Sequence, residues 1–399
     1  MSRLPEHPFV LYRDRLDVYG RALTAGWDDE RFVETVRRLD EHVSGVDGAG
    51  FAITPLTEEA GMAGGLDLRG RLFVKDETGN VSGSHKARHL FGTMLAFLVD
   101  GDDPARDLAI ASCGNAALAA AVVARAQERN LRVFIPTWAD PVVVGKLEAL
   151  GADITECERR PGEAGDPAFL RFEEAVAGGA RAFSVQGPST PTALDGGRTI
   201  GWEVADQLEA AGVIGPVRVF LQVGGGALAS CAFRGILEGA APSLDPRFHT
   251  VQGEACAPLR RAWRLLGEAI AGPSDLNDRG LAANLTTEVL SEAVDLATTR
   301  SGDFMWAWEE VGASIATGIL DDVTYDWIAL LEPLIATRGW PVVVSEADLV
   351  EANRLALAHT NIPVDATGSA GLAGLFDVDI RDDLMEDETV VVAFTGRIR

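Results

Sequence analysis

The sequence has little lysine and a marked deficit of positive charge. Only three of its 35 basic residues are lysines, Lys75, Lys86 and Lys146, and the rest are arginines. Sixty acidic side chains give the 399-residue chain a formal charge of −25. Nucleic acids and anionic membrane surfaces are bound by basic faces, so this balance argues against both as partners.

Cysteine patterns and long apolar runs are also missing. Cys113, Cys157, Cys231 and Cys256 lie far apart, without a C-x-x-C motif or Cys/His pairing, so we expect no metal site and no disulfide framework. The start, M1-S-R-L-P-E-H-P, lacks an apolar signal region. No apolar run reaches the roughly eighteen residues that a membrane-spanning helix needs. The expected compartment is the cytosol.

The chain begins with a helical pattern and then alternates between strands and helices. Residues 1–50 are charged, with apolar positions at helical spacing. The predicted strands are L72-F-V-K, L108-A-I-A-S, R132-V-F-I-P, V217-R-V-F-L-Q-V, F248-H-T-V-Q and T389-V-V-V-A-F. Helical stretches between such strands predict a parallel sheet covered by helices, with ligands at the carboxyl ends of strands. Residues 267–339 are the hardest to interpret, and we expect helices and a surface excursion there.

One of the rare lysines follows the first of these strands. It stands in V81-S-G-S-H-K-A-R-H89, at a strand-to-helix turn among small and hydroxyl residues. An amine becomes a useful nucleophile only if its pKa falls, and we expect His85, Arg88 and His89 to supply the positive charge that lowers it. The alternative is an ordinary solvated lysine at a helix start.

A second turn follows the next predicted strand, in A111-S-C-G-N-A-A-L-A. Gly114 permits a tight turn, and Ser112 and Asn115 offer hydrogen-bonding side chains. The N–H groups at the start of the next helix can hold a carboxylate. The alternative is a capped helix without a ligand.

Two further turns complete the pattern. Gly224, Gly225 and Gly226 follow V217-R-V-F-L-Q-V and suit a phosphate monoester, although such glycines can also serve close helix–sheet packing. Thr395 follows the last strand and offers a hydroxyl to a heteroaromatic nitrogen, although a Thr-Gly pair can be only a turn. An amine, a carboxylate site, a phosphate cradle and a hydroxyl are the groups that hold pyridoxal phosphate as an imine and present an amino acid to it.

From Thr54 to Thr395 the order of these motifs resembles the fold type II pyridoxal-phosphate enzymes. That group contains threonine synthase, serine/threonine dehydratases, cysteine synthase and the tryptophan synthase β subunit. The resemblance implies that Lys86, in S84-H-K86, carries the cofactor imine. It further implies that Asn115 bonds the cofactor's 3′-hydroxyl and that Thr395 faces the pyridine nitrogen. The implied phosphate contacts are Gly224, Gly225, Gly226 and Ala227, and the implied substrate contacts are Ser84, Ser112, Cys113, Gly114 and Asn115.

Two positions depart from the pattern of the family. His85 stands where many members have phenylalanine, as in the tryptophan synthase β subunit, where the histidine lies near the phosphate. Cys113 stands where the dehydratase and racemase branch has a second serine that can act from the face opposite the lysine. A thiol could do that work, and the alternative is a small buried cysteine that fills space.

The resemblance implies an α/β fold of parallel-rich, twisted sheets flanked by helices. It implies a large cofactor-binding domain of residues 51–90 and 193–399, with a smaller inserted domain of residues 91–192. Residues 1–50 are expected to form a helical extension that packs on the large domain. Many relatives are dimers, so a homodimer is expected.

The implied activity is that of an amino-acid lyase of the ammonia-lyase type. Lys86 would remove the α-proton of a serine- or threonine-like amino acid, and a β-leaving group would be expelled to give an aminoacrylate-type intermediate. Two alternatives remain open. One is a synthase that performs β- or γ-replacement, and the other is a cofactor-binding partner or regulatory protein without turnover.

Overall fold

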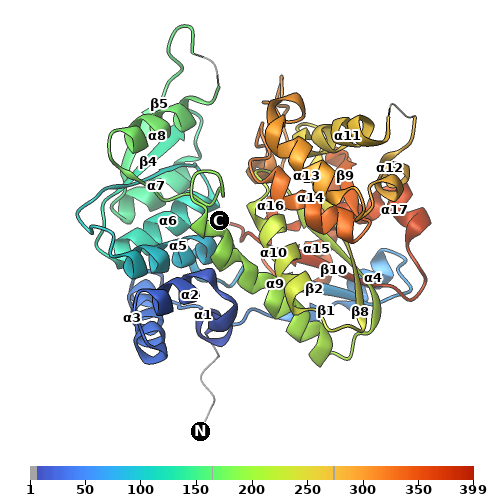
Figure 1. The fold of residues 1–399 in the computed structure, drawn as a ribbon, viewed down its shortest axis with the longest axis horizontal. Helices are drawn as coiled ribbons and strands as arrows, with labels where there is room; N and C mark the ends of the chain where they lie inside the picture. Colours follow the sequence, from blue (N-terminus) through green and yellow to red (C-terminus); the bar gives the residue numbers. More distant parts are fainter. Residues whose placement is uncertain (1–6, 164, 273–274) are drawn as a thin grey trace. The chain divides into compact units, whose positions relative to one another are not determined.

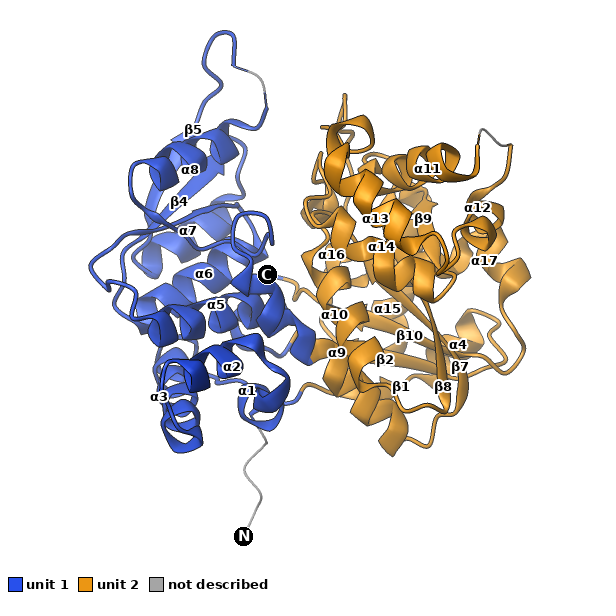
Figure 2. Ribbon diagram, viewed as in Figure 1, with its two compact units in different colours: residues 1–53, 79–199, 399 blue, residues 54–78, 200–398 orange. Residues whose placement is uncertain are grey.

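The computed structural model describes residues 7–163, 165–272 and 275–399 (Figure 1). The chain forms two compact units (Figure 2). Unit 1 consists of residues 1–53, 79–199 and 399, and unit 2 consists of residues 54–78 and 200–398. Among the described residues, no helix combines the length and the apolar character needed to cross a membrane.

Unit 2 is built on a six-stranded sheet in which β10 lies between β2 and β7. The strand order is β1-β2-β10-β7-β8-β9, and all neighbours pair in parallel except β1 with β2. The six residues of β10, T-V-V-V-A-F, are all buried, as expected for a central parallel strand covered on both faces. The strands are β1 (Leu56–Glu58), β2 (Leu72–Asp76), β7 (Gly215–Gln222), β8 (Leu244–Gly253), β9 (Trp340–Val344) and β10 (Thr389–Phe394).

Helices and 3₁₀ turns surround this sheet. The glycine-led helix α10 packs on β7, and the rings of Phe233 in α10 and Phe248 in β8 stack with centroids 4.3 Å apart. The helices are α4 (Ala60–Gly65), α10 (Ala227–Gly239), α11 (Pro258–Ala271), α12 (Asp278–Asn284), α13 (Leu290–Thr299), α14 (Trp327–Ala336), α15 (Glu346–His359), α16 (Ala366–Ser369) and α17 (Val378–Asp383). The 3₁₀ turns are η3 (Ser301–Asp303), η4 (Thr317–Ile319) and η5 (Ala370–Phe376).

Unit 1 contains a parallel four-stranded sheet in the order β5-β4-β3-β6. Helices α5 and α6 pack together and are buried over most of their length, which explains why their sequences are apolar on nearly every side. The strands are β3 (Leu108–Ala111), β4 (Leu131–Pro136), β5 (Asp153–Cys157) and β6 (Arg181–Ala182). The helices are α1 (Pro8–Leu11), α2 (Asp17–Thr24), α3 (Asp29–Asp47), α5 (Lys86–Asp100), α6 (Asn115–Ala126), α7 (Pro141–Ala149) and α8 (Pro167–Ala177), with the 3₁₀ turns η1 (Arg13–Arg15) and η2 (Val81–Gly83).

The expected fold class is confirmed, and the six strands predicted from the sequence are β2, β3, β4, β7, β8 and β10. Strands β1, β5, β6 and β9 were not predicted. The region 267–339 contains the end of α11, the helices α12, α13 and α14, and the turns η3 and η4, so the expectation of helices there is confirmed, while that of a surface excursion stays a prediction. Its short elements explain why no single period could be read there.

The compact units are bounded differently from the domains expected from the sequence. Residues 79–90 and 193–199 lie in unit 1 with the smaller sheet, and so do the N-terminal helices. The reason is packing, because α3 and α5 both lie against α6, and Asp195 accepts hydrogen bonds from the N–H groups of Asp17 and Val18. Helix α9 (Thr192–Ala210) begins in unit 1 and continues into unit 2 after Thr199.

A buried arginine anchors the start of β7 in unit 2. Arg218 donates two hydrogen bonds to the Glu388 carboxylate, at 2.9 and 3.0 Å, and a third of 2.9 Å to Asp383. Arg218 is fully buried and Glu388 is 2% exposed. Burial alone would raise the pKa of Asp383, but its bond to Arg218 and the charges of Arg218, Arg247 and Arg279 hold it below the usual value.

Replacing Arg218 is expected to destabilise unit 2 severely. Arg218→Met removes the guanidinium from a buried carboxylate, which costs about 3–5 kcal/mol of unfolding free energy. Urea unfolding of this variant measures the loss. The matched control is Arg247→Met, which leaves Asp383 its two other arginines and should cost at most about 1 kcal/mol. Equal stability of Arg218→Met and wild type would contradict this role.

Candidate functional site

The turn before α5 is held in an unusual backbone conformation. Ser82 and Gly83 have φ values of +57° and +71°, and serine rarely adopts this left-handed conformation. The N–H of Gly83 donates to the carbonyl oxygen of Asn80 at 2.8 Å, and the N–H of Ser82 donates to Asp47 in α3 at 3.1 Å. Burial raises the pKa of Asp47, although the bond from Ser82 opposes that shift. The N-terminal helix α3 therefore supports this turn.

Lys86 is the first residue of α5, and its side chain is partly buried. A helix N-terminus carries a partial positive charge, which disfavours an ammonium group there. Arg88 is fully buried, and its guanidinium donates to Thr199 at 3.0 Å. The sequence predicted that Lys86 lies at the start of a helix, and the structure places it there.

The expected contribution of His89 to the charge around Lys86 is wrong. Its Nδ1 lies 2.9 Å from the carbonyl oxygen of Ala193, which only accepts, so Nδ1 carries the proton. Complete burial, followed by the charge of Lys86, lowers the pKa of His89 to about 3. His89 is therefore neutral at physiological pH. The ring of His85, also buried, lies 5.8 Å from that of His89 in an edge-on arrangement.

The loop after β3 leaves open space at Gly114. A Cβ at this position would meet no heavy atom within 4 Å among the described residues. Packing of the described chain therefore does not require glycine here. The lack of a side chain leaves the N–H groups at the start of α6 open to a ligand.

Two predicted side chains near this loop carry buried polar atoms. Within the part of the chain that the structure describes, Ser84 Oγ and Asn115 Oδ1 have no hydrogen-bond partner. Buried polar atoms are normally paired, so these two fit contact with a ligand. Helix α6, which Asn115 starts, packs against both η2 and α5. Ser112 and Cys113, in the same loop, are partly buried, and Ser112 Oγ accepts a 3.4 Å bond from the N–H of Gly114.

The glycine loop of unit 2 is packed against protein. A Cβ on Gly224 would lie 2.4 Å from a carboxylate oxygen of Asp321, and one on Gly225 would lie 3.1 Å from the Tyr325 ring. The N–H of Asp326 donates to the carbonyl oxygen of Gly225 at 2.8 Å. These glycines are therefore packed against residues 319–326, and not at the helix–sheet contact considered from the sequence. A phosphate on this loop would also have the Asp321 carboxylate nearby.

The last glycine of the loop begins a helix. Gly226 has a φ of +101° and is the N-cap of α10, of which Ala227 is the first residue. The left-handed conformation favours glycine, and the start of a 13-residue helix directs N–H groups and partial positive charge at an anion. These features fit a phosphate.

Thr395 lies beside the glycine loop within unit 2. It follows β10, the neighbour of β7, and the side-chain amide nitrogen of Gln222, at the end of β7, lies 2.6 Å from the Thr395 hydroxyl. Sequence reasoning missed Gln222 and Asp321. A polar residue that ends a buried strand just before the glycines was the available signal for Gln222. No local signal indicated Asp321, which is about a hundred residues from the loop that it contacts.

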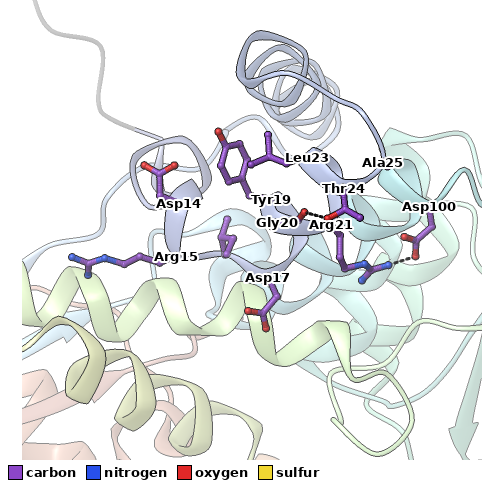
Figure 3. Close-up of a pocket in the computed structure, with 11 residues that line it drawn as sticks. Asp14, Arg15, Asp17, Tyr19, Gly20, Arg21, Leu23, Thr24, Ala25 and Asp100 are labelled. Carbon is purple, nitrogen blue, oxygen red and sulfur yellow. Dashed lines mark hydrogen bonds and ion pairs between the residues drawn. The ribbon is translucent and has the colours of Figure 1, made fainter.

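A surface hollow of about 770 Å³ in unit 1 contains none of the predicted site residues. It is lined by η1, α2 and Asp100, and Figure 3 shows the ion pair of Arg21 and Asp100 at one side. No group of three or more histidine, cysteine or acidic side chains that could bind a metal occurs within the described ranges.

The comparisons with known proteins agree in one family. The family described as "Pyridoxal-phosphate dependent enzyme" matches residues 49–396. No curated protein matches the chain in sequence. Similar solved structures include maize serine racemase, with 15% identity, a TM-score of 0.63 and coverage of 92% of this chain and 93% of that one.

Two further similar structures are lyases. Diaminopropionate ammonia lyase from Escherichia coli has 17% identity and a TM-score of 0.66, with coverage of 91% of this chain and 88% of that one. L-serine ammonia-lyase from Rhizomucor miehei has 20% identity and a TM-score of 0.61, with coverage of 87% and 94%. At these identities the likeness establishes the fold.

The neutral state of His89 predicts a pH-dependent stability. A histidine whose pKa is lowered resists protonation in the folded state, while the unfolded chain takes up the proton below its ordinary pKa of 6.5. Stability from His89 is therefore complete above that value and is lost as the pH falls toward 3. Between about pH 8 and about pH 5, the stability advantage of wild type over His89→Gln should shrink by about 2 kcal/mol.

Urea unfolding at both pH values measures this change. The matched control is His42→Gln, at an exposed position, whose stability difference from wild type should stay constant. A constant difference for His89→Gln as well would show that His89 is not buried in its neutral form.

Proposed function

Because the chain belongs to the pyridoxal-phosphate-dependent enzymes of the fold type II group, we propose that it is an amino-acid lyase of the ammonia-lyase type. Its substrate would be a serine- or threonine-like amino acid that loses its β-substituent. Pyridoxal phosphate is the cofactor of this family. When bound, the cofactor withdraws electrons from the α-carbon of an amino acid and makes the α-proton acidic.

Lys86 is assigned two roles in this proposal. Its amine would hold the cofactor through the aldehyde, and it would also take the α-proton of the substrate as the general base. It is partly buried at the start of α5. The other two lysines do not suit this role, because Lys75 is fully buried in a pair with Glu203, and Lys146 is exposed on α7.

The observation that carries the proposal is the empty space at Gly114. A carboxylate can approach the N–H groups at the start of α6 there without meeting a side chain. Ser84 Oγ and Asn115 Oδ1 add buried polar atoms that, within the described residues, have no hydrogen-bond partner. We assign Ser112, Cys113 and Gly114 to the substrate carboxylate, and Asn115 to the 3′-hydroxyl of the cofactor. These assignments suit an amino acid better than a substrate without a carboxylate.

The remaining contacts are assigned to unit 2. The amides of Gly224, Gly225, Gly226 and Ala227 would bind the phosphate at the start of α10, and the Thr395 hydroxyl would face the pyridine nitrogen. A hydroxyl does not hold that nitrogen in its protonated form as a carboxylate would. With that nitrogen unprotonated, the cofactor would withdraw electrons from the α-carbon less strongly, which favours rapid loss of a β-leaving group over racemisation or transamination.

The experiment that tests the lyase proposal must also distinguish it from racemisation, replacement and cofactor binding without turnover. The similar structures include racemases as well as ammonia-lyases, so racemisation must be measured beside elimination. Replacement of the β- or γ-substituent, and cofactor binding without turnover, are the alternatives that the sequence left open. We also propose a cytosolic homodimer that acts on small amino acids.

A panel of amino acids tests the proposed reaction. The protein, loaded with pyridoxal phosphate, is incubated with serine, threonine and their analogues, and 2-oxo acid, ammonia, D-amino acid and new amino acids are measured. The expected products are oxo acid and ammonia in equal amounts. Lys86→Ala should lose at least about 10³-fold in rate because it lacks the general base.

The matched control is Lys146→Ala, which should retain wild-type activity. Accumulation of D-amino acid without ammonia would replace the lyase by a racemase, and a new amino acid formed with an added nucleophile would replace it by a synthase. No turnover of any substrate by the loaded protein would leave the non-catalytic alternative.

A further inference from the structure

Gln222 is a polar residue at a buried position, and its presence there requires a physical explanation. It ends β7, two residues before the glycine loop, and is 4% exposed. Its Oε1 is buried and has no hydrogen-bond partner among the described residues. An unpaired buried oxygen costs about 1–3 kcal/mol, which an apolar residue at this position would avoid. The amide nitrogen must therefore account for the presence of glutamine.

The surroundings determine how the amide is oriented. The nitrogen lies 2.8 Å from the carbonyl oxygen of Gly368 and 2.6 Å from the hydroxyl of Thr395, and the carbonyl oxygen of Ala393 lies farther away at 3.5 Å. Carbonyl oxygens only accept hydrogen bonds, so the nitrogen and not the oxygen of the amide must face them. Its two hydrogens then go to Gly368 and to Thr395.

A glycine, Gly371, lies beside the Gln222 amide. A Cβ on Gly371 would lie 2.9 Å from Gln222 Oε1 and 3.0 Å from the carbonyl oxygen of Phe220, so a side chain there would force Gln222 or its neighbours to shift. The Thr395 backbone is held by the same segment, because its N–H donates to Gly368 at 3.3 Å. The N–H of Asp365 likewise donates to Gly396 at 2.9 Å. Both the backbone and the hydroxyl of Thr395 are therefore fixed.

The bond from Gln222 determines the direction in which the Thr395 hydroxyl acts. A hydroxyl oxygen that accepts a hydrogen bond from the amide turns its own hydrogen away from that amide. The Thr395 hydroxyl then donates its hydrogen to a polar group on the side away from Gln222. A ring nitrogen can accept this hydrogen only while it is unprotonated.

We propose that Gln222 is a positioning residue that makes Thr395 a hydrogen-bond donor to the ring nitrogen of the cofactor and thereby keeps that nitrogen unprotonated. The inference rests on the proposed assignment of Thr395, and it concerns cofactor electronics rather than the reaction catalysed. Gln222 touches neither substrate nor cofactor in this role, because it acts through Thr395.

The direct test observes the ring nitrogen itself. Wild type and two variants are loaded with pyridoxal phosphate labelled with ¹⁵N in the ring, and the nitrogen chemical shift is followed with pH by NMR. The wild-type signal should stay at the value of an unprotonated, hydrogen-bonded nitrogen over the whole range in which the protein is folded. In Gln222→Met the hydroxyl can rotate, so the nitrogen should begin to titrate within that range.

Gln222→Glu keeps the shape of the side chain but presents an acceptor to Thr395. The hydroxyl then donates to the carboxylate and turns a lone pair to the ring, so the protonated fraction should be larger than in Gln222→Met. Ring-nitrogen signals in both variants identical to wild type at every pH would overturn the proposal. The two variants have different packing, so the test does not depend on the folding of one of them.

A double-mutant cycle separates positioning from a structural role. Gln222→Met should weaken cofactor binding about two- to tenfold, the value of one hydrogen bond. If Gln222 acts through Thr395, Gln222→Met should cause no further loss in a Thr395→Val background. Additive losses would contradict the proposal, because they would mean that Gln222 only supports the fold.

These readouts also distinguish this inference from the proposed function. If the loaded protein showed the expected ring-nitrogen titration but no elimination, the proposed lyase activity would be wrong and the role of Gln222 would stand. If wild type catalysed elimination but both variants gave the wild-type ring-nitrogen signal, the lyase activity would stand and the role of Gln222 would be overturned. Failure of wild type to take up the cofactor would overturn both.

Discussion

The left-handed turn at Ser82 and Gly83 is the constraint on which the lysine site depends. It lies just before α5, which begins at Lys86, and a serine can remain in this conformation only if surrounding contacts hold it. Asp47 at the end of α3 provides one such contact. The charged N-terminal helices, which carry no motif of their own, therefore contribute to the site by fixing the geometry of this turn.

The two glycine sites show that similar sequence signals can have different physical causes. Gly114 borders open space, which leaves room for a ligand at the start of α6. The glycines at 224–226 are required by the packing of residues 319–326 and by the left-handed N-cap of α10. A phosphate there would depend on the helix N-terminus to offset the nearby Asp321. The turn at Gly114 is thus open to a ligand, whereas the glycine loop at 224–226 is packed against other residues of the chain.

Local patterns predicted much of the fold and the lysine turn, but not the contacts between distant segments. Continuous β-branched runs such as T389-V-V-V-A-F identified the central strands. The order of turns placed Ser112, Gly224 and Thr395 just after strands and Lys86 at the start of a helix. The short strands β1 and β6 have too few residues for a period. The neutrality of His89 follows from its complete burial, and the proposed role of Gln222 follows from the pairing of β7 with β10, and neither is encoded locally.

The central claim is that one lysine of the three carries the cofactor, and it can be tested without any substrate. The protein is loaded with pyridoxal phosphate, reduced with borohydride and digested, and the modified peptide is identified by mass spectrometry. The account predicts a stable pyridoxyl adduct on Lys86 alone, with Lys75 and Lys146 unmodified. An adduct on either of those lysines, or fully loaded protein with an unmodified Lys86, would contradict it.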